Sequence, residues 1–125
     1  MEIILKKTKE VPFKLDTVDG KFICRNPKAS DYVAFWAEFR AVEGTEKEKN
    51  EKQVKLVVDT FLSFVEDITF DKEVSFKDED GKDLDTKEAI AEYFSFMVYQ
   101  KGMEFLNPSF GGSQSDPLEQ SSAAS

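Results

Sequence analysis

Carboxylates are the most numerous groups in this chain that could do chemistry. Two carboxylates can share acid–base work when a cleft separates their pKa values. Asp59, Glu66, Asp67 and Glu92 lie on or near the helices that we expect, and they could meet in space. Carboxylates on helix surfaces are far more often solvated or paired with lysine. We therefore do not predict an active site at these four residues.

Nucleophilic and metal-dependent chemistry is restricted further by the scarcity of its usual side chains. The chain has one cysteine, Cys24, and no histidine, which rules out Ser-His-Asp and Cys-His sites and the usual zinc ligand sets. Cys24 precedes Arg25, which could lower the pKa of its thiol, although a buried and inert thiol is the commoner outcome. We predict no catalytic, cofactor-binding or metal-binding residue, and no enzyme.

The acidic run Asp78-Glu79-Asp80-Gly81 has the composition of a calcium loop. An EF-hand loop has its glycine at position six, which would place Phe76 at position one and Lys87 at position twelve. Those positions require an aspartate and a bidentate glutamate. The run is therefore interpreted as a solvated acidic turn.

Length and charge limit the class of protein. The 125 residues suffice for one ordinary domain, and 17 basic against 25 acidic residues give a net charge of −8. A negative chain repels phosphate, so we predict neither a nucleic-acid partner nor a membrane partner. The start, MEIILKKTKE, reverses the order of a signal peptide, and one cysteine cannot form an internal disulfide. We expect a soluble, intracellular protein.

A β-hairpin is expected near the start of the chain. Val11–Leu15 and Lys21–Arg25 alternate apolar and polar residues, and Asp19-Gly20 between them is typical of a tight turn. Residues 2–6, with Ile3-Ile4-Leu5, are a candidate third strand. Pro12 cannot donate to a ladder, which predicts an edge strand at that point.

Helices are expected in the rest of the chain. One begins at the N-cap Ser30 and ends before Gly44, and a second begins at the capping box Thr45-Glu46-Lys47-Glu48 and runs to about Glu66. Its first two turns are charged, and its second half has an apolar stripe from Val54 to Val65. Residues 66–88 form an acidic connector. A further helix begins after Asp85, carries Ile90, Tyr93, Phe94, Met97 and Val98 inward, and stops at Asn107-Pro108.

These elements predict an α+β fold that is mostly α, with an N-terminal antiparallel hairpin or small sheet packed on a bundle of about three helices. We expect residues 1–108 to form a single folded domain and residues 109–125 to form a disordered polar tail. The connector has ten acids and four lysines, whereas the first forty residues have eight basic and six acidic residues. This asymmetry weakly favours a head-to-tail self-contact.

Twelve phenylalanines are the remaining signal. Most of these phenylalanines should lie in the core. Exposed aromatic patches mark interfaces, so we expect some of the phenylalanines to line a groove that binds an apolar helix of another protein. The predicted protein-binding residues are Phe94, Phe96, Tyr99, Phe105, Phe61 and Phe64.

The order of these elements resembles the tail assembly chaperones of long-tailed bacteriophages, in their short form. The resemblance lies in the hairpin VPFKLDTVDGKFICR, the helix SDYVAFWAEF and the stretch VVDTFLSFVEDITFDKEVSFKDEDGKDLDTKEAIAEYFSFMVYQKGMEFLNP, and it spans roughly residues 1–108. It is a likeness of pattern, without a catalytic signature.

The resemblance implies a non-catalytic chaperone without cofactors. Such proteins bind the tape measure protein, keep it soluble and help the tail tube protein polymerise around it, in part through a frameshifted longer form. They self-associate, act in the host cytoplasm and are absent from the mature virion. The alternatives are a generic oligomerising adaptor, a minor structural virion protein, or a small enzyme that uses carboxylates.

Overall fold

The computed structural model describes residues 1–107. The elements run in the order β1 (Thr8–Leu15), β2 (Val18–Arg25), α1 (Ala29–Arg40), α2 (Glu46–Phe64), β3 (Val65–Phe70), β4 (Phe76–Lys77), β5 (Asp83–Leu84), α3 (Thr86–Tyr93) and α4 (Ser95–Leu106). The predicted stop at Pro108 and the predicted disordered tail lie outside the described residues.

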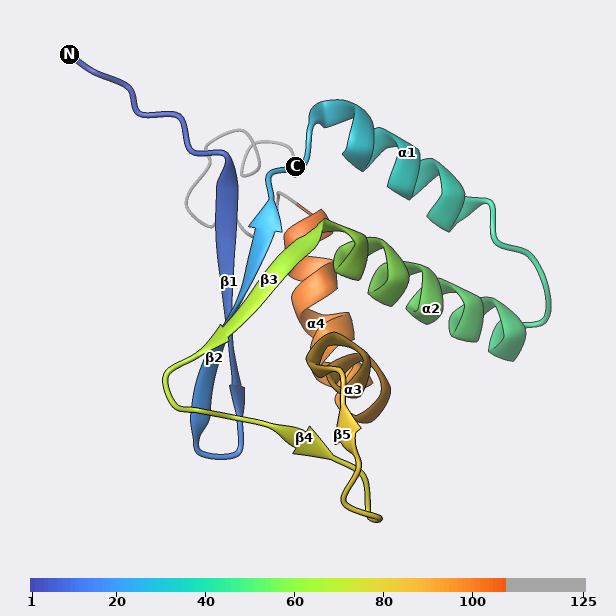
Figure 1. Ribbon diagram of the computed structural model, residues 1–125. Helices are drawn as coiled ribbons and strands as arrows, with labels where there is room; N and C mark the ends of the chain where they lie inside the picture. Colours follow the sequence, from blue (N-terminus) through green and yellow to red (C-terminus); the bar gives the residue numbers. More distant parts are fainter. Residues whose placement is uncertain (108–125) are drawn as a thin grey trace.

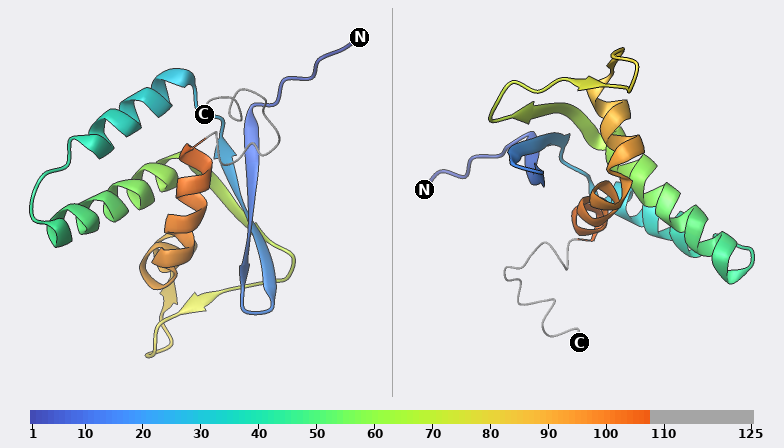
Figure 2. Two further views of the ribbon diagram at one scale, coloured as in Figure 1. Left: turned by 180° about the vertical axis from the view of Figure 1, so that it is seen from behind. Right: turned by 90° about the horizontal axis from the view of Figure 1, so that it is seen from below.

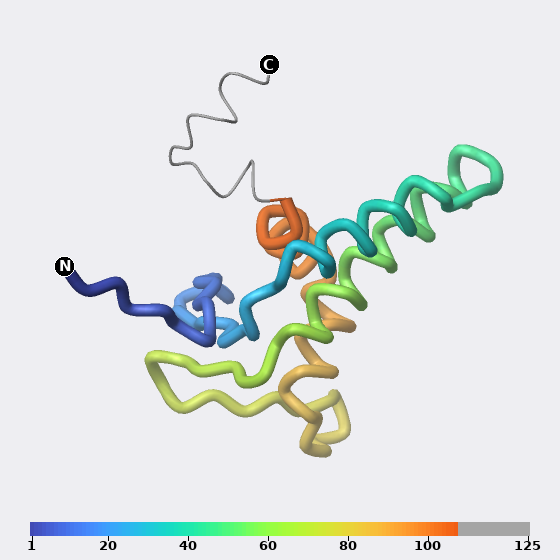
Figure 3. The backbone as a smooth tube through the Cα atoms, turned by 90° about the horizontal axis from the view of Figure 1, so that it is seen from above, coloured from blue at the N-terminus to red at the C-terminus, as the bar shows by residue number. Residues whose placement is uncertain are grey.

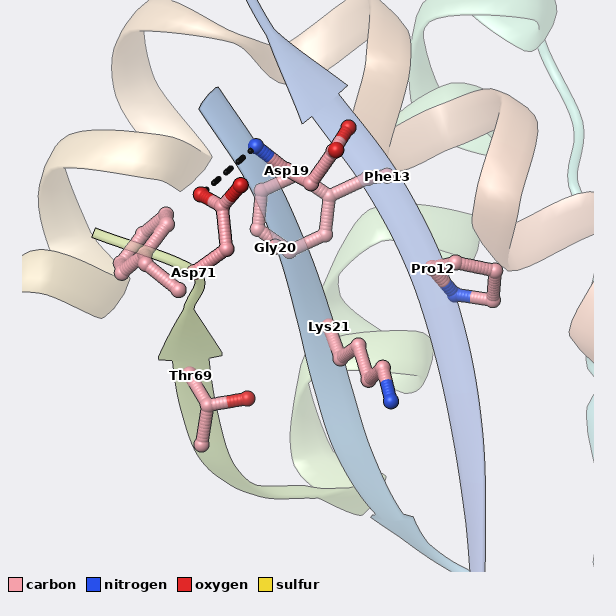
Figure 4. Close-up of a pocket in the computed structure, with 8 residues that line it drawn as sticks. Pro12, Phe13, Asp19, Gly20, Lys21, Thr69 and Asp71 are labelled. Atoms are coloured by element: carbon pink, nitrogen blue, oxygen red, sulfur yellow. Dashed lines mark hydrogen bonds between the residues drawn. The ribbon is translucent and has the colours of Figure 1, made fainter.

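The expected hairpin is confirmed, but its turn is not at Asp19-Gly20. Leu15 pairs with Val18, so the turn is Asp16-Thr17, and Asp16 adopts the positive φ of 55°. Gly20 lies inside β2 opposite Phe13, where a Cβ atom would come within 2.5 Å of the Phe13 ring. Glycine is therefore needed there for close approach of an aromatic ring, and not for a turn (Figure 4).

The third strand of the sheet is not the N-terminal segment. The strand order is β1-β2-β3, and β3 comes from the start of the expected acidic connector. Residues 1–6 form no strand, and Ile3, Ile4 and Leu5 are exposed. Ile68 and Phe70 alternate with the polar residues Asp67 and Thr69, which was a strand signal that the high charge of this region obscured. Pro12 does lie on an edge strand, β1, as predicted.

The N-cap of helix α1 lies two residues before the expected N-cap Ser30. Lys28 occupies the N-cap, and its backbone N–H donates to the Asp31 carboxylate at 2.7 Å. The inner face of α1 carries Phe35 and Trp36, and the indole Nε1 donates to the carbonyl of Leu106 at 2.8 Å. This bond ties α1 to the end of α4.

Helix α2 confirms the predicted capping box. The Glu48 N–H donates to the Thr45 hydroxyl at 3.2 Å, and the Thr45 N–H donates to the Glu48 carboxylate at 3.0 Å. The helix ends at Phe64, two residues before the expected end, because the chain continues directly into β3. Helices α1 and α2 lie side by side and project from the sheet (Figure 3). The charged first turns of α2 are exposed. Further along α2, Gln53 Nε2 donates a hydrogen bond to the Phe39 carbonyl of α1 at 3.1 Å.

The expected last helix is two helices. Asp85 caps α3 by accepting the Glu88 N–H at 3.1 Å, as its sequence predicts. The break lies at Phe94, with φ −127° and ψ 36°. Gly102 lies within α4 against α2, where a Cβ atom would be 3.0 Å from Phe61 and from Val57. The glycine therefore lets two helices approach closely.

The core lies between the sheet, α2 and α4 (Figures 1 and 2). Phe61 is fully buried, with its ring 5.1 Å from that of Phe22 on β2 and 5.3 Å from that of Phe105 on α4. Helices make up 48% of the described residues and strands 24%, which confirms the predicted α+β fold with mostly helical content.

Candidate protein-binding surface

The break at Phe94 exposes a short run of aromatic residues between α3 and α4. Phe94 ends one helix and begins the next: its N–H donates to the Ile90 carbonyl at 2.9 Å, and its own carbonyl accepts from Val98 at 3.0 Å. The bend leaves Tyr93 63% exposed and Phe96 70% exposed. Large apolar side chains exposed together are typical of an interaction surface.

A groove between α2 and α4 lies on one side of this bend. It has a volume of about 440 Å³ and is lined by Asn50, Glu51, Val54, Lys55, Val58, Asp59 and Ser95. Val54 and Val58 supply its apolar floor, and Phe96 follows Ser95 directly. The charged residues line its edges, where Lys55 Nζ pairs with the Asp59 carboxylate at 2.8 Å. We call this hollow the α2–α4 groove.

A second hollow lies between α3 and the small β4–β5 hairpin. It has a volume of about 560 Å³ and is lined by Phe76, Lys77, Asp78, Glu79, Asp80, Leu84, Ala89, Tyr93 and Phe94. Its walls are aromatic and aliphatic, and its rim is acidic. We call it the hairpin hollow; the β4–β5 hairpin that contributes to its lining lies at the lower end of the view in Figure 1.

The structure divides the six predicted protein-binding residues into two groups. Phe94 and Phe96 are exposed, and half-buried Tyr99 stacks on Phe96 at a centroid distance of 6.5 Å. The other three are buried in the core, which corrects that part of the prediction, although the edge of the Phe105 ring also lines a small hollow beside β1: Phe61, Phe64 and Phe105.

Burial explains why those three rings belong to the core. Phe61 contacts Phe105, which in turn packs 5.6 Å from Phe64. The outer face of Phe64 is covered by the Arg25 guanidinium, 4.1 Å from the ring centroid. Each ring thus has aromatic or cationic neighbours within the chain.

Sequence reasoning missed three contributors to the surface. Val54 and Tyr93 were expected to point inward, yet both are exposed. The apolar stripe of α2 extends beyond the residues that pack against the core, which leaves Val54 exposed, and the bend at Phe94 exposes Tyr93. Leu84 was not singled out. The alternation of Asp83, Leu84 and Asp85 before a capped helix was the available signal for a short strand at that point.

The carboxylates considered for acid–base chemistry do not form one group. Asp59 pairs with Lys55 on α2, Glu66 and Asp67 lie on β3, and Glu92 is exposed on α3. Among residues 1–107, no group of three or more His, Cys, Asp or Glu residues could hold a metal ion. A hollow of about 360 Å³ beside Gly20 includes Asp19 and Asp71, whose carboxylate accepts the Asp19 N–H at 3.2 Å (Figure 4).

The acidic turn at residues 78–81 is stabilised by its own backbone. The Asp78 carboxylate accepts the N–H groups of Asp80 and Lys82, each at 2.9 Å, and Gly81 adopts a φ of 82°. One Asp78 oxygen is thus engaged as a turn cap. This geometry agrees with the sequence interpretation of a solvated acidic turn.

Cys24 is fully buried in the core face of the sheet. Burial raises the pKa of its thiol to about 11, Glu66 adds to this rise, and Lys9 and Lys87 oppose it. The expected effect of Arg25 does not operate, because that guanidinium lies over Phe64. Cys24 is therefore a protonated core residue at neutral pH, which agrees with the sequence interpretation of a buried and inert thiol.

This raised pKa predicts a loss of stability in alkaline solution. The Cys24 thiol of the unfolded chain loses its proton near pH 9, whereas that of the folded chain keeps it up to about pH 11. The stability that the buried, protonated thiol contributes to the folded chain is therefore complete below pH 9 and is lost as pH rises to about 11. The full effect is about 2 to 3 kcal/mol in the free energy of unfolding. Urea unfolding of wild type and of Cys24→Ala across this range measures it, since lysine titration is common to both. Parallel pH profiles for the two chains would contradict the prediction.

Comparison of the chain with family models, with curated proteins and with solved structures found no match. Within residues 1–107, no helix has the length and apolar character needed to cross a membrane.

Proposed function

We propose that the chain is a non-catalytic tail assembly chaperone of a long-tailed bacteriophage, which binds the tape measure protein and keeps it soluble. Two kinds of evidence support this function: the resemblance of the sequence to that family, and a surface to which a client could bind. The observation that carries it is the α2–α4 groove, with its floor of Val54 and Val58 and with Phe96 exposed beside it. The groove is apolar where a client would lie and charged at its edges.

The shape of the groove suits a helical client. Helix-in-groove recognition places the apolar face of one helix in a furrow between two others, with anchors at successive turns. Val54 and Val58 are one turn apart on α2, and Phe96 is an exposed residue of α4 that directly follows the lining residue Ser95. Burial contributes about 25 cal/mol per Å² of apolar area removed from water, so capture needs no chemistry.

The charge of the chain supports the solubilising part of the proposal. A net charge of −8 keeps a complex with an apolar client in solution and repels nucleic acid. Many weakly bound copies along a long client would bind with high avidity. The tail tube protein is the proposed second partner, through a frameshifted longer form of this chain.

The proposed place of action is the host cytoplasm during assembly, with the chain absent from the mature virion. The alternatives, a minor structural virion protein or a generic oligomerising adaptor, differ in this respect. A structural protein would be retained in purified particles, so mass spectrometry of those particles separates it from a chaperone.

Co-expression tests the proposed function. The tape measure protein of the same phage is produced with and without this chain, and its soluble fraction is measured after centrifugation. We expect it to aggregate alone and to remain soluble, in a complex that co-purifies, when the chain is present. A tape measure protein that stays insoluble in the presence of the folded chain would overturn the proposal.

A further inference from the structure

We propose that the hairpin hollow binds the N-terminal segment Ile3-Ile4-Leu5 of a second copy of this chain, so that copies join head to tail. The inference concerns the chain alone and does not depend on the proposed client. It rests on two features: three adjacent apolar residues without cover, and a hollow of matching chemistry at the other end of the molecule.

The N-terminal segment is the most exposed apolar sequence of the described chain. Ile3, Ile4 and Leu5 have exposed fractions of 74%, 78% and 84%. The chain is held from Lys6 onward, since the Lys6 carbonyl accepts from Asn26 Nδ2 at 2.8 Å. The segment thus extends from a fixed point into solvent, as Figure 1 shows at the end marked N.

The hairpin hollow offers complementary walls and charge. Phe76, Leu84 and Tyr93 provide an apolar lining for the three aliphatic side chains. The rim carries Asp78, Glu79 and Asp80, while the segment is followed by Lys6 and Lys7. An apolar tripeptide followed by lysines therefore matches an apolar hollow bordered by acids.

The rim keeps its negative charge in the isolated chain. Lys77, the basic residue of the rim, forms an ion pair with Asp83. Within residues 1–107, Glu79 and Asp80 take part in no ion pair. Two carboxylates thus remain to attract the lysines of another copy.

The segment cannot reach the hollow of its own chain. Phe70, whose ring lies 6.1 Å from that of Phe76, is level with Gly20 and Phe13 in the sheet. Phe13 is five residues beyond Thr8 along β1, a distance of about 17 Å. Ile3 is three residues from the anchored Lys6 and reaches at most about 11 Å. The chain end marked N points away from the β4–β5 hairpin (Figure 1). A second copy must therefore supply the segment.

Such a contact joins two different surfaces and leaves one of each free at the ends. Repetition then produces a closed ring or an open filament, and not a symmetric dimer. The α2–α4 groove and the hairpin hollow share no lining residue, so the contact does not use the groove.

Sedimentation velocity of the full chain over a range of concentrations tests the inference. We expect the wild type to form oligomers, and two variants to be monomers at the same concentrations: Ile3→Ser/Ile4→Ser/Leu5→Ser, and Tyr93→Ser/Leu84→Ser. Each variant loses one half of the contact, so a mixture of the two should form dimers and nothing larger. The matched control Val33→Ser removes an exposed valine of α1 and should associate as the wild type does.

A charge reversal avoids any effect of the hollow variant on folding. Exposed Glu79→Lys should weaken association about tenfold or more, and Lys6→Glu/Lys7→Glu in the partner chain should restore it. A monomeric wild type, association that survives loss of the N-terminal side chains, or failure of the two defective variants to form dimers on mixing would each overturn the inference.

Discussion

Replacing Phe61 by alanine should lower the free energy of unfolding by about 3 to 5 kcal/mol, the range for deleting a buried aromatic ring. Phe61 is fully buried and connects three elements, because its ring meets Phe22 of the sheet and Phe105 of α4. The cavity would lie where Gly102 brings α4 against α2, a contact with little room to collapse. Equilibrium unfolding in urea, followed by circular dichroism, measures the change.

Phe96→Ala is the matched control for this prediction. It deletes the same ring from an exposed position, where we expect a change within about 0.5 kcal/mol, as is usual for surface substitutions. Equal destabilisation by the two substitutions would show that the division of the aromatic residues into core and surface is wrong.

The sequence predicted the elements with strong local signals. The capping box at Thr45, the cap at Asp85 and the alternation around the hairpin each depend on neighbouring residues, and each appears in the structure. Gly20 shows the limit of such signals, because Asp-Gly is typical of turns while this glycine is required by a ring across the sheet.

The errors concern partners that are distant in sequence. Most residues of β3 were interpreted as part of an acidic connector. The strand pairs with β2 residues more than forty positions away, and such a distant pairing leaves no signal in the neighbouring sequence. The exposed aromatic residues depend on a bend at Phe94 that no glycine or proline marks. Phe61 and Phe96 are the same residue type in helices of similar periodicity, so only the packing of α4 on α2 and the sheet separates core from surface.

The second large effect concerns client capture by the α2–α4 groove. Val54→Ser/Phe96→Ser removes apolar groups from the floor and from the adjoining exposed surface, leaving the buried core intact. Full burial of a valine or phenylalanine side chain is worth about 1.5 to 3 kcal/mol. Because a client covers each side chain only in part, we expect the pair to contribute about 3 kcal/mol, or roughly 100-fold in affinity.

The most direct test of a chaperone that works through this apolar surface is the soluble fraction of the tape measure protein co-expressed with matched variants. Val33→Ser removes an exposed valine outside the groove and should keep the client soluble. Val54→Ser/Phe96→Ser, with the helical circular dichroism of the wild type, should leave the client in the pellet. Equal client solubility with the two variants would contradict the assignment of binding to the α2–α4 groove.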